Sequence, residues 1–154
     1  MKLFCFASRT ETNIWLGVKA KKWVVSTVSF SAMAARISKA ERYVEIGDRG
    51  VLYCNPTHSL TTPFIVRSKP DPTAVVSDIW PEPWRLPFDI EPLGDPSKQL
   101  HMSEAYKQLS LLRAAMQPSI SAAMNITGTT VFVPKDIQES DWDILLEHLQ
   151  TQKG

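Results

Sequence analysis

Ile46-Gly47-Asp48-Arg49-Gly50-Val51-Leu52-Tyr53-Cys54 joins a turn that contains two glycines to a short apolar run. An apolar run of this length beside turn residues is typical of a buried strand. The preceding segment, residues 31–44, has apolar side chains at spacings of three and four, which predicts an amphipathic helix. This part of the chain is therefore predicted to be helix, turn and buried strand.

Further elements are predicted on both sides of this unit from runs of apolar residues, strand alternation and helical stripes. Pro87 lies inside one of them, which indicates an edge strand or a bulge. The predicted elements are strands at 2–7, 64–66, 84–91 and 129–133, helices at 101–116 and from Ser140 onward, the latter opened by a capping box, a polar hairpin loop at 55–63, and loop followed by strand at 13–26.

The length and composition suit one ordinary domain. The chain has 154 residues, of which 44% are hydrophobic and 21% are charged. This is enough to bury one core. We expect a single domain at residues 1–150, with 151–154 as a tail from which a linker to a further region could start.

The apolar stretches are too short for a membrane span or a secretory signal, so an intracellular, cytoplasmic protein is expected. Cys5 and Cys54 each lie in an apolar run, which predicts two buried reduced thiols. The glycines form no phosphate-binding loop, so nucleotide hydrolysis is not expected.

The formal net charge of +1 conceals an asymmetry along the chain. Residues 1–70 carry eleven Lys or Arg and four acidic residues, whereas residues 71–154 carry six and twelve. A basic half is the electrostatic footprint of a phosphate binder. Lys19, Lys21 and Lys22 lie next to Trp23, where a backbone contact and a base contact could be neighbours. The alternative is a solvated basic face.

The most informative stretch for function is Trp80-Pro81-Glu82-Pro83-Trp84. Its prolines hold the backbone extended and reduce the entropy lost in fixing two indoles. A base between two indoles gains about 1–3 kcal/mol per stacked face, comparable with the few kcal/mol needed to extrude it from a duplex. The alternative is that these tryptophans are core or hairpin-edge residues. Trp142 is assigned to the core, and Trp15 is left undecided.

The order of these segments resembles the EVE domain of the PUA-like superfamily and its close relative, the YTH domain. The EVE-like pieces are Trp15 to Val18, Ile46 to Asp48 with Val51 to Tyr53, Pro70 to Thr73 after Phe64 to Val66, and Val131 to Trp142. The YTH-like pieces are Ser8, Trp23 with Ser26 and Thr27, Ala34 and Ala35, and Trp80 with Trp84 before Phe88, Asp89 and Ile90. Together they span nearly the whole chain.

The resemblance implies an α+β fold, a PUA-like twisted β-barrel with flanking α-helices, and a pocket for a flipped or single-stranded modified base. It places Trp23, Trp80 and Trp84 in an aromatic cage, with Ser8, Asn13 and the Val24 backbone as readers of the base edge. Trp15 replaces Trp23 if the EVE register holds. Charge and proximity in the chain make Arg9, Lys19, Lys21, Lys22 and Arg36 the phosphate-binding candidates. Two departures are Ala7, where the family usually has Lys, and the spacing of four between the paired tryptophans.

The function predicted from these features is recognition of a methylated adenine or cytosine without catalysis, cofactor or metal. DNA is favoured over RNA, as in the specificity domain of a modification-dependent restriction system with a fused or associated NTPase or nuclease. The alternatives are an RNA-binding PUA-like reader and a protein-interaction module. Cys5 or Cys54 with a histidine lacks a nucleophile elbow, which argues against an enzyme. The acids Glu139, Asp141 and Asp143 fit the first turn of a helix better than a metal site.

Overall fold

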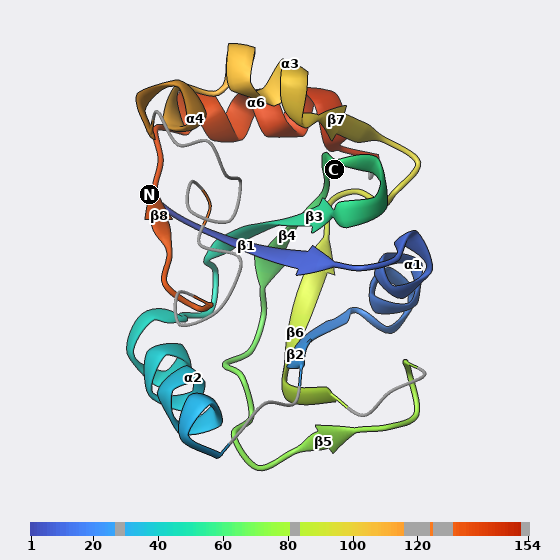
Figure 1. Ribbon diagram of the computed structural model, residues 1–154, viewed down its shortest axis with the longest axis vertical. Helices are drawn as coiled ribbons and strands as arrows, with labels where there is room; N and C mark the ends of the chain where they lie inside the picture. Colours follow the sequence, from blue (N-terminus) through green and yellow to red (C-terminus); the bar gives the residue numbers. More distant parts are fainter. Residues whose placement is uncertain (27–29, 81–83, 116–123, 125–130, 152–154) are drawn as a thin grey trace.

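The computed structural model describes residues 1–26, 30–80, 84–115, 124 and 131–151. A mixed sheet crosses the molecule, with helices at its two ends and along its sides (Figure 1). Its strands in the described residues are β1 (Lys2–Ser8), β2 (Lys22–Ser26), β3 (Arg49–Cys54), β4 (Ser59–Val66), β5 (Val75–Val76), β6 (Trp84–Pro92), β7 (Gln99–His101) and β8 (Lys135–Asp136). Strands β1 and β3 run parallel, and every other pairing is antiparallel.

The sheet is open. Its order is β2-β6-β4-β3-β1-β8, with β5 on β6 and β7 on β4. Within the described residues β2 pairs with β6 and β8 pairs with β1, so no ladder joins the two ends. The α+β class with flanking helices is confirmed, and the sheet expected as a twisted β-barrel is not closed.

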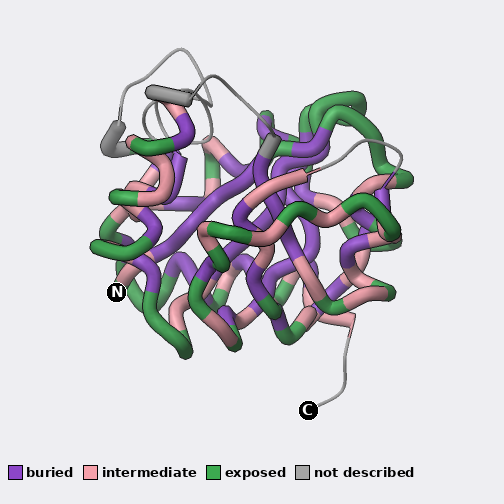
Figure 2. Tube along the Cα trace, turned by 90° about the horizontal axis from the view of Figure 1, so that it is seen from below, coloured by how far each residue is buried: buried purple, intermediate pink, exposed green. Residues whose placement is uncertain are grey.

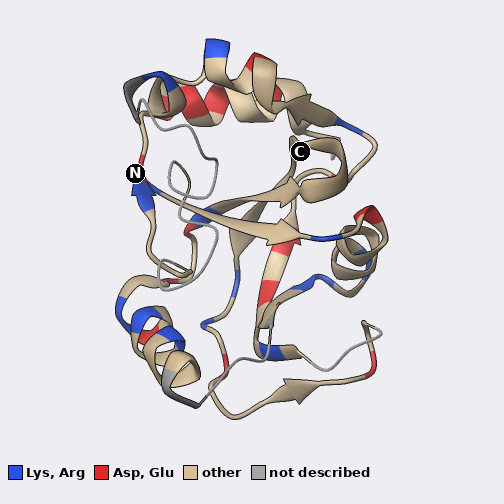
Figure 3. Cartoon of the chain, viewed as in Figure 1, with Lys and Arg blue, Asp and Glu red and all other residues tan. Residues whose placement is uncertain are grey.

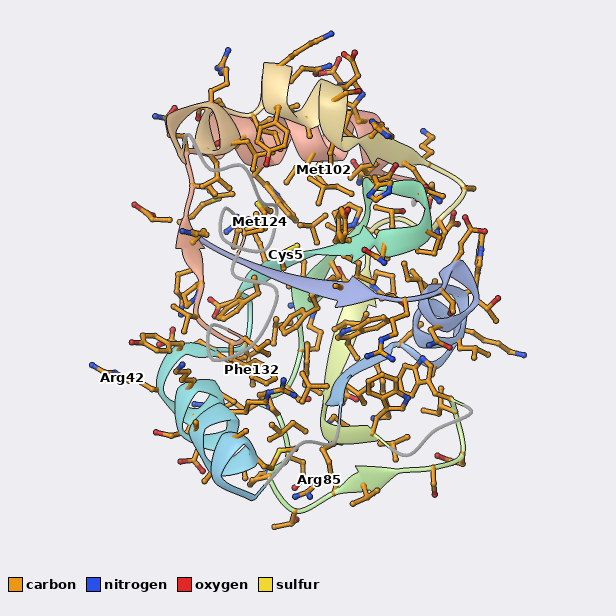
Figure 4. The ribbon with its side chains drawn as sticks, viewed as in Figure 1. Cys5, Arg42, Arg85, Met102, Met124 and Phe132 are labelled. Carbon is orange, nitrogen blue, oxygen red and sulfur yellow. The ribbon has the colours of Figure 1, made fainter. Side chains whose placement is uncertain are left out.

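Alternate residues of the central strands face two separate cores. Phe4 and Phe6 of β1 belong to the core beside β2 and β6. Leu3 and Cys5 belong to the core beneath the terminal helices. Figure 2 shows the resulting buried band along the middle of the molecule, and Figure 4 shows Cys5 on the same side of β1 as Met124. Residues 3–6 of β1 are all buried and alternate between the two cores, as expected of a strand covered on both faces.

Helices α1 (Glu11–Ala20) and α2 (Phe30–Tyr43) flank the first core, and α3 (Met102–Gln108), α4 (Ser110–Ala115) and α6 (Glu139–Leu149) gather over the second (Figure 1). The helix predicted at 31–44 is confirmed as α2. The prediction of loop and then strand at 13–26 is wrong in its first half, because α1 occupies it. Thr10 caps this helix by accepting a hydrogen bond from Asn13 N at 3.1 Å.

Three other predicted elements are corrected. The helix at 101–116 is two helices, because Leu109 has extended backbone (φ −88°, ψ 121°). At 129–133, Val131 and Phe132 lie in a turn rather than a strand, while 129–130 lie outside the described residues. The loop at 55–63 contains a short 3₁₀ helix, Asn55–Thr57, and β4 already begins at Ser59.

Several predictions about individual residues are confirmed. Cys5 and Cys54 are free and buried. Trp142 is buried, with the Arg49 guanidinium 5.6 Å from its ring centroid. Strand β6 carries a bulge beside Pro87, as its proline indicates. In the ranges that the structure describes, no helix combines the length and apolarity that crossing a bilayer requires.

Candidate functional site

Two of the predicted cage tryptophans are in direct contact. The ring centroids of Trp23, on β2, and Trp80, which precedes β6 in the chain, are 6.0 Å apart with an interplanar angle of 85°. Both side chains are 4% exposed. A base held between two indoles needs their faces to be parallel, so this edge-to-face pair does not enclose an open slot. The structure thus brings the two rings together but in a closed arrangement.

The indole N–H of Trp80 is held by α1. Trp80 Nε1 donates to the backbone oxygen of Asn13 at 2.9 Å. Asn13 is half-buried in the first turn of α1, so this predicted reader of the base edge adjoins the tryptophan pair. One helix therefore positions both Asn13 and the Trp80 ring.

Ser8 lies at the end of β1, where the chain turns into α1. Its hydroxyl is buried and donates to Thr10 O at 2.7 Å. Thr10 in turn caps α1. The Ser8 hydroxyl thus holds the turn that leads into α1, and its role as a reader of the base edge stays a prediction.

Val24 lies opposite the β6 bulge. The β2–β6 register shifts between Trp23 and Val25, so Leu86 and Pro87 oppose Val24. Leu86 has a φ of 55°, which is uncommon for a residue other than glycine, and Pro87 has no N–H to donate to β2. These features interrupt the regular ladder beside Trp23, at the residue whose backbone is predicted to read the base.

Trp84 begins β6 and pairs in register with Ser26 and Val76. Its side chain is half-buried against the same core as Trp23 and Trp80. Its indole Nε1 is buried without a hydrogen-bond partner. Leaving a buried N–H unpaired costs about 1–3 kcal/mol, and no partner for this donor is found in the described part of the chain.

Trp15 is separated from this group by the body of α1. Asn13 and Gly17, which contact Trp80 and Trp23, are each two residues away from Trp15. Because successive residues of a helix are rotated by about 100°, Trp15 lies on nearly the opposite face of α1 from both of them. Its side chain is 42% exposed. The structure therefore does not bring Trp15 together with the other tryptophans.

The predicted phosphate-binding residues fall into two groups. Arg9, Lys19 and Lys21 are exposed around the two ends of α1, and Lys22 beside them pairs with Asp89 of β6. Arg36 lies on α2, apart from α1 (Figure 3), and partial burial lowers its pKa. The α1 group adjoins the tryptophan pair, whereas Arg36 does not belong to that group.

Gly17 is a residue of this site that the sequence analysis missed. It lies in α1 directly against the Trp23 ring. The signals that could have revealed the helix are the capping residue Thr10 and the apolar pair Ile14 and Val18 at a spacing of four.

The described part of the chain supports neither a metal site nor Cys5 as a nucleophile. No group of three or more His, Cys, Asp or Glu side chains is placed there to hold a metal ion. Burial raises the pKa of the Cys5 thiol far above its ordinary value, so that thiol is protonated. Cys5 is therefore unsuited to act as a nucleophile.

No family model matches the chain, and no curated protein matches it in sequence. Solved structures do match. The YTH domain of the Zygosaccharomyces rouxii MRB1 protein, in complex with N6-methyladenosine RNA, aligns with a TM-score of 0.61 and 15% identity over 97% of this chain and 89% of that one.

Two further structures agree. The Pho92 YTH domain in complex with m6A aligns with a TM-score of 0.58 and 13% identity, over 99% of this chain and 85% of the other. Protein Atu2648 from Agrobacterium tumefaciens aligns with a TM-score of 0.52 and 14% identity, over 99% and 100%. At these identities the likeness concerns the fold, and on that evidence the chain has a YTH-like fold.

Proposed function

We propose that this protein binds a nucleic-acid strand that carries a methylated base and holds that base, extruded from its stack, against Trp23. The observation that carries the proposal is the contact between Trp23 and Trp80 on a YTH-like fold. Support comes from two similar structures, the Pho92 YTH domain in complex with m6A and the MRB1 YTH domain in complex with N6-methyladenosine RNA. No catalytic step is part of the proposal.

Binding requires the closed tryptophan pair to open. The edge contact and the Trp80–Asn13 hydrogen bond are each worth about 0.5–1.5 kcal/mol. Once Trp80 has moved, a base stacked on the Trp23 ring returns about 1–3 kcal/mol, and a second indole face adds a similar amount. Displacing Trp80 also costs the burial of an indole that is 4% exposed, which the base must replace, and Trp80 or Trp84 supplies the second face.

The polar groups beside the pair recognise the edge of the base. When Trp80 moves away, the Asn13 backbone oxygen loses its donor and can accept an N–H from the base. The Val24 backbone at the bulge and the Ser8 hydroxyl complete the predicted set. A methyl group adds about 0.8 kcal/mol by burial and up to about 3 kcal/mol in a shaped apolar pocket, so the preference for methylation is moderate.

The cations at the ends of α1 hold the strand. Arg9, Lys19 and Lys21 are exposed there, while Lys22 is partly neutralised by Asp89. Three phosphate contacts to a single strand give a slope of about −2 in log K against log salt. A partner protein bound through apolar contacts would show a much smaller slope, so salt titration separates the reader from the protein-interaction module.

The ligand we test first is RNA with N6-methyladenine, because the MRB1 structure contains such an RNA. Methylated DNA, favoured by the sequence analysis, stays a proposal, as does association with a nuclease or NTPase of a restriction system. Both ligands present a methylated base on a flexible strand. RNA and DNA oligonucleotides of the same sequence therefore show which of the two the protein prefers.

The test is a fluorescence-anisotropy titration of the full chain with single-stranded RNA and DNA of one sequence, each unmodified or carrying N6-methyladenine or 5-methylcytosine. We expect about tenfold tighter binding of a methylated strand. Trp23→Phe and Trp84→Phe each reduce that preference by about fivefold or more, since each loses stacking area. Trp15→Ala, on the other face of α1, is the matched control and leaves the preference unchanged. Equal affinity for all six strands would contradict the proposal.

A further inference from the structure

Gly17 occupies an unusual place in α1 for a residue without a side chain. It lies in the interior of a ten-residue helix, Glu11–Ala20, and is buried. Glycine inside a helix is less favourable than alanine. Among the glycines that the structure describes, Gly47 alone has a positive φ, so the backbone of Gly17 has an ordinary helical conformation. The reason for glycine at this position is therefore space and not backbone conformation.

The space is taken by Trp23. A Cβ atom on residue 17 would lie 2.8 Å from Cε3 and 2.9 Å from Cζ3 of the Trp23 ring, and 3.0 Å from the Lys22 backbone oxygen. These distances are shorter than ordinary carbon–carbon contacts of about 3.5–4.0 Å. The ring thus lies directly on the helix backbone, and any side chain at residue 17 would push it away.

The ring has little room to yield. Trp80 meets Trp23 edge-on at 6.0 Å, and Trp23 is 4% exposed. Trp80 is in turn tied to Asn13 on the same helix. A Cβ on residue 17 would therefore displace the Trp23 ring and disturb its contact with Trp80, which is where the proposed function places the base.

We infer that Gly17 is a positioning residue for base recognition: its missing side chain sets how closely Trp23 lies against α1 and so keeps room for a base on the ring. This inference rests on the proposed function. It adds a specificity-determining position that contacts the base only through Trp23.

The first test is Gly17→Ala, assayed by the same anisotropy titration with methylated and unmethylated RNA. We expect a five- to tenfold loss of affinity for the methylated strand, because the displaced ring loses part of one stacking interaction. The affinity for the unmethylated strand should change little. Thr12→Ala, an alanine substitution at an exposed position of α1, is the matched control and binds like the wild type. Wild-type affinity and preference in Gly17→Ala would overturn the inference.

The second test separates positioning from a merely structural role. Trp23→Phe lacks the atoms corresponding to Cε3 and Cζ3, so adding Gly17→Ala to it should cost less affinity than adding it to the wild type, although the contact with the Lys22 backbone oxygen remains. An additive loss in the double variant would show that Gly17 acts elsewhere and would overturn the inference.

Near-ultraviolet circular dichroism gives a readout that is independent of binding. We expect Gly17→Ala to change the tryptophan band in the Trp23 protein and to leave it unchanged in the Trp23→Phe background. An unchanged band in both backgrounds would overturn the inference. If the wild type shows no methyl preference, the proposed function fails, and this spectral comparison still decides whether Gly17 positions Trp23.

Discussion

Asp141 shows how one residue can serve a different element from the one that contains it. The sequence around Ser140 predicts a capping box for its own helix, but the N-cap of α6 is Gln138, which makes no side-chain cap. The Asp141 carboxylate instead accepts hydrogen bonds from Ser110 N, Ser110 Oγ and Leu111 N at 2.8, 2.9 and 3.0 Å. It is 2% exposed and so caps α4 from within the core.

Asp141→Asn should therefore destabilise the protein. The amide keeps one acceptor oxygen but turns an NH₂ group toward the N–H donors of α4, which leaves a buried donor unpaired. We expect the free energy of unfolding in urea to fall by about 1–3 kcal/mol. Asp143→Asn, at an exposed position of the same helix, should change it by less than about 0.5 kcal/mol. Equal effects of the two substitutions would argue against the cross-helix cap.

Helix α1 is the element on which the candidate site depends. It holds Trp80 through Asn13, supports Trp23 through Gly17, and has exposed lysines near its C-terminal end. Isolated helices of this length are marginal in water. Its start is stabilised by the Thr10 cap and its end by Lys21, which has the left-handed conformation with φ 56°.

Thr10→Ala should weaken both stability and binding. Loss of the acceptor for Asn13 N costs about 0.5–2 kcal/mol of unfolding free energy, measured by urea denaturation. Because fraying begins at the turn that holds Asn13, affinity for the methylated strand should fall by a few fold. Thr10→Ser retains the hydroxyl and should restore most of both properties. A variant with full stability and affinity would show that the cap does not support the site.

At the scale of the whole molecule, the sheet separates two cores with different contents. The core beside β2 and β6 holds the tryptophan pair, and the core beneath α3, α4 and α6 holds Cys5 and Tyr53. Burial raises the pKa of the Cys5 thiol above its ordinary value of 9.0. Burial is also the largest cause of the raised pKa of the Tyr53 hydroxyl, whose ordinary value is 10.0. These acids stay protonated in the folded chain at pH values where they ionise in the unfolded chain.

Stability should consequently fall in alkali. A group with a raised pKa in the folded state contributes its full stability below the unfolded pKa and loses it as pH rises above that value. The unfolding free energy should decline from about pH 9, with a slope of up to about 1.4 kcal/mol per pH unit for the buried Cys5 thiol. Urea denaturation from pH 7 to 10.5 measures it. Cys5→Val should flatten the curve between pH 9 and 10, and an unchanged curve would contradict the prediction.

The periodicity of the sequence determined much of the local structure. Spacings of three and four predicted α2 and α6, short apolar runs predicted β1, β3 and the end of β4, and Pro87 indicated the bulge in β6. These predictions succeeded because an element that buries one face must repeat its apolar residues with its own period. The resemblance to YTH domains rested on the same order of segments, which explains why the fold agrees at low identity.

Tertiary structure alone decided the features that depend on which segments meet. The short helix α1 was missed because segment 13–26 mixes apolar residues with Lys19, Lys21 and Lys22, which obscures an apolar stripe, and contacts with β2 and Trp80 hold the helix in place. The open sheet depends on pairings at its two edges, which no local pattern records. The closed Trp23–Trp80 pair and the Asn13–Trp80 hydrogen bond, which spans 67 residues of chain, depend on packing, since contact between distant side chains depends on volume and direction and not on spacing.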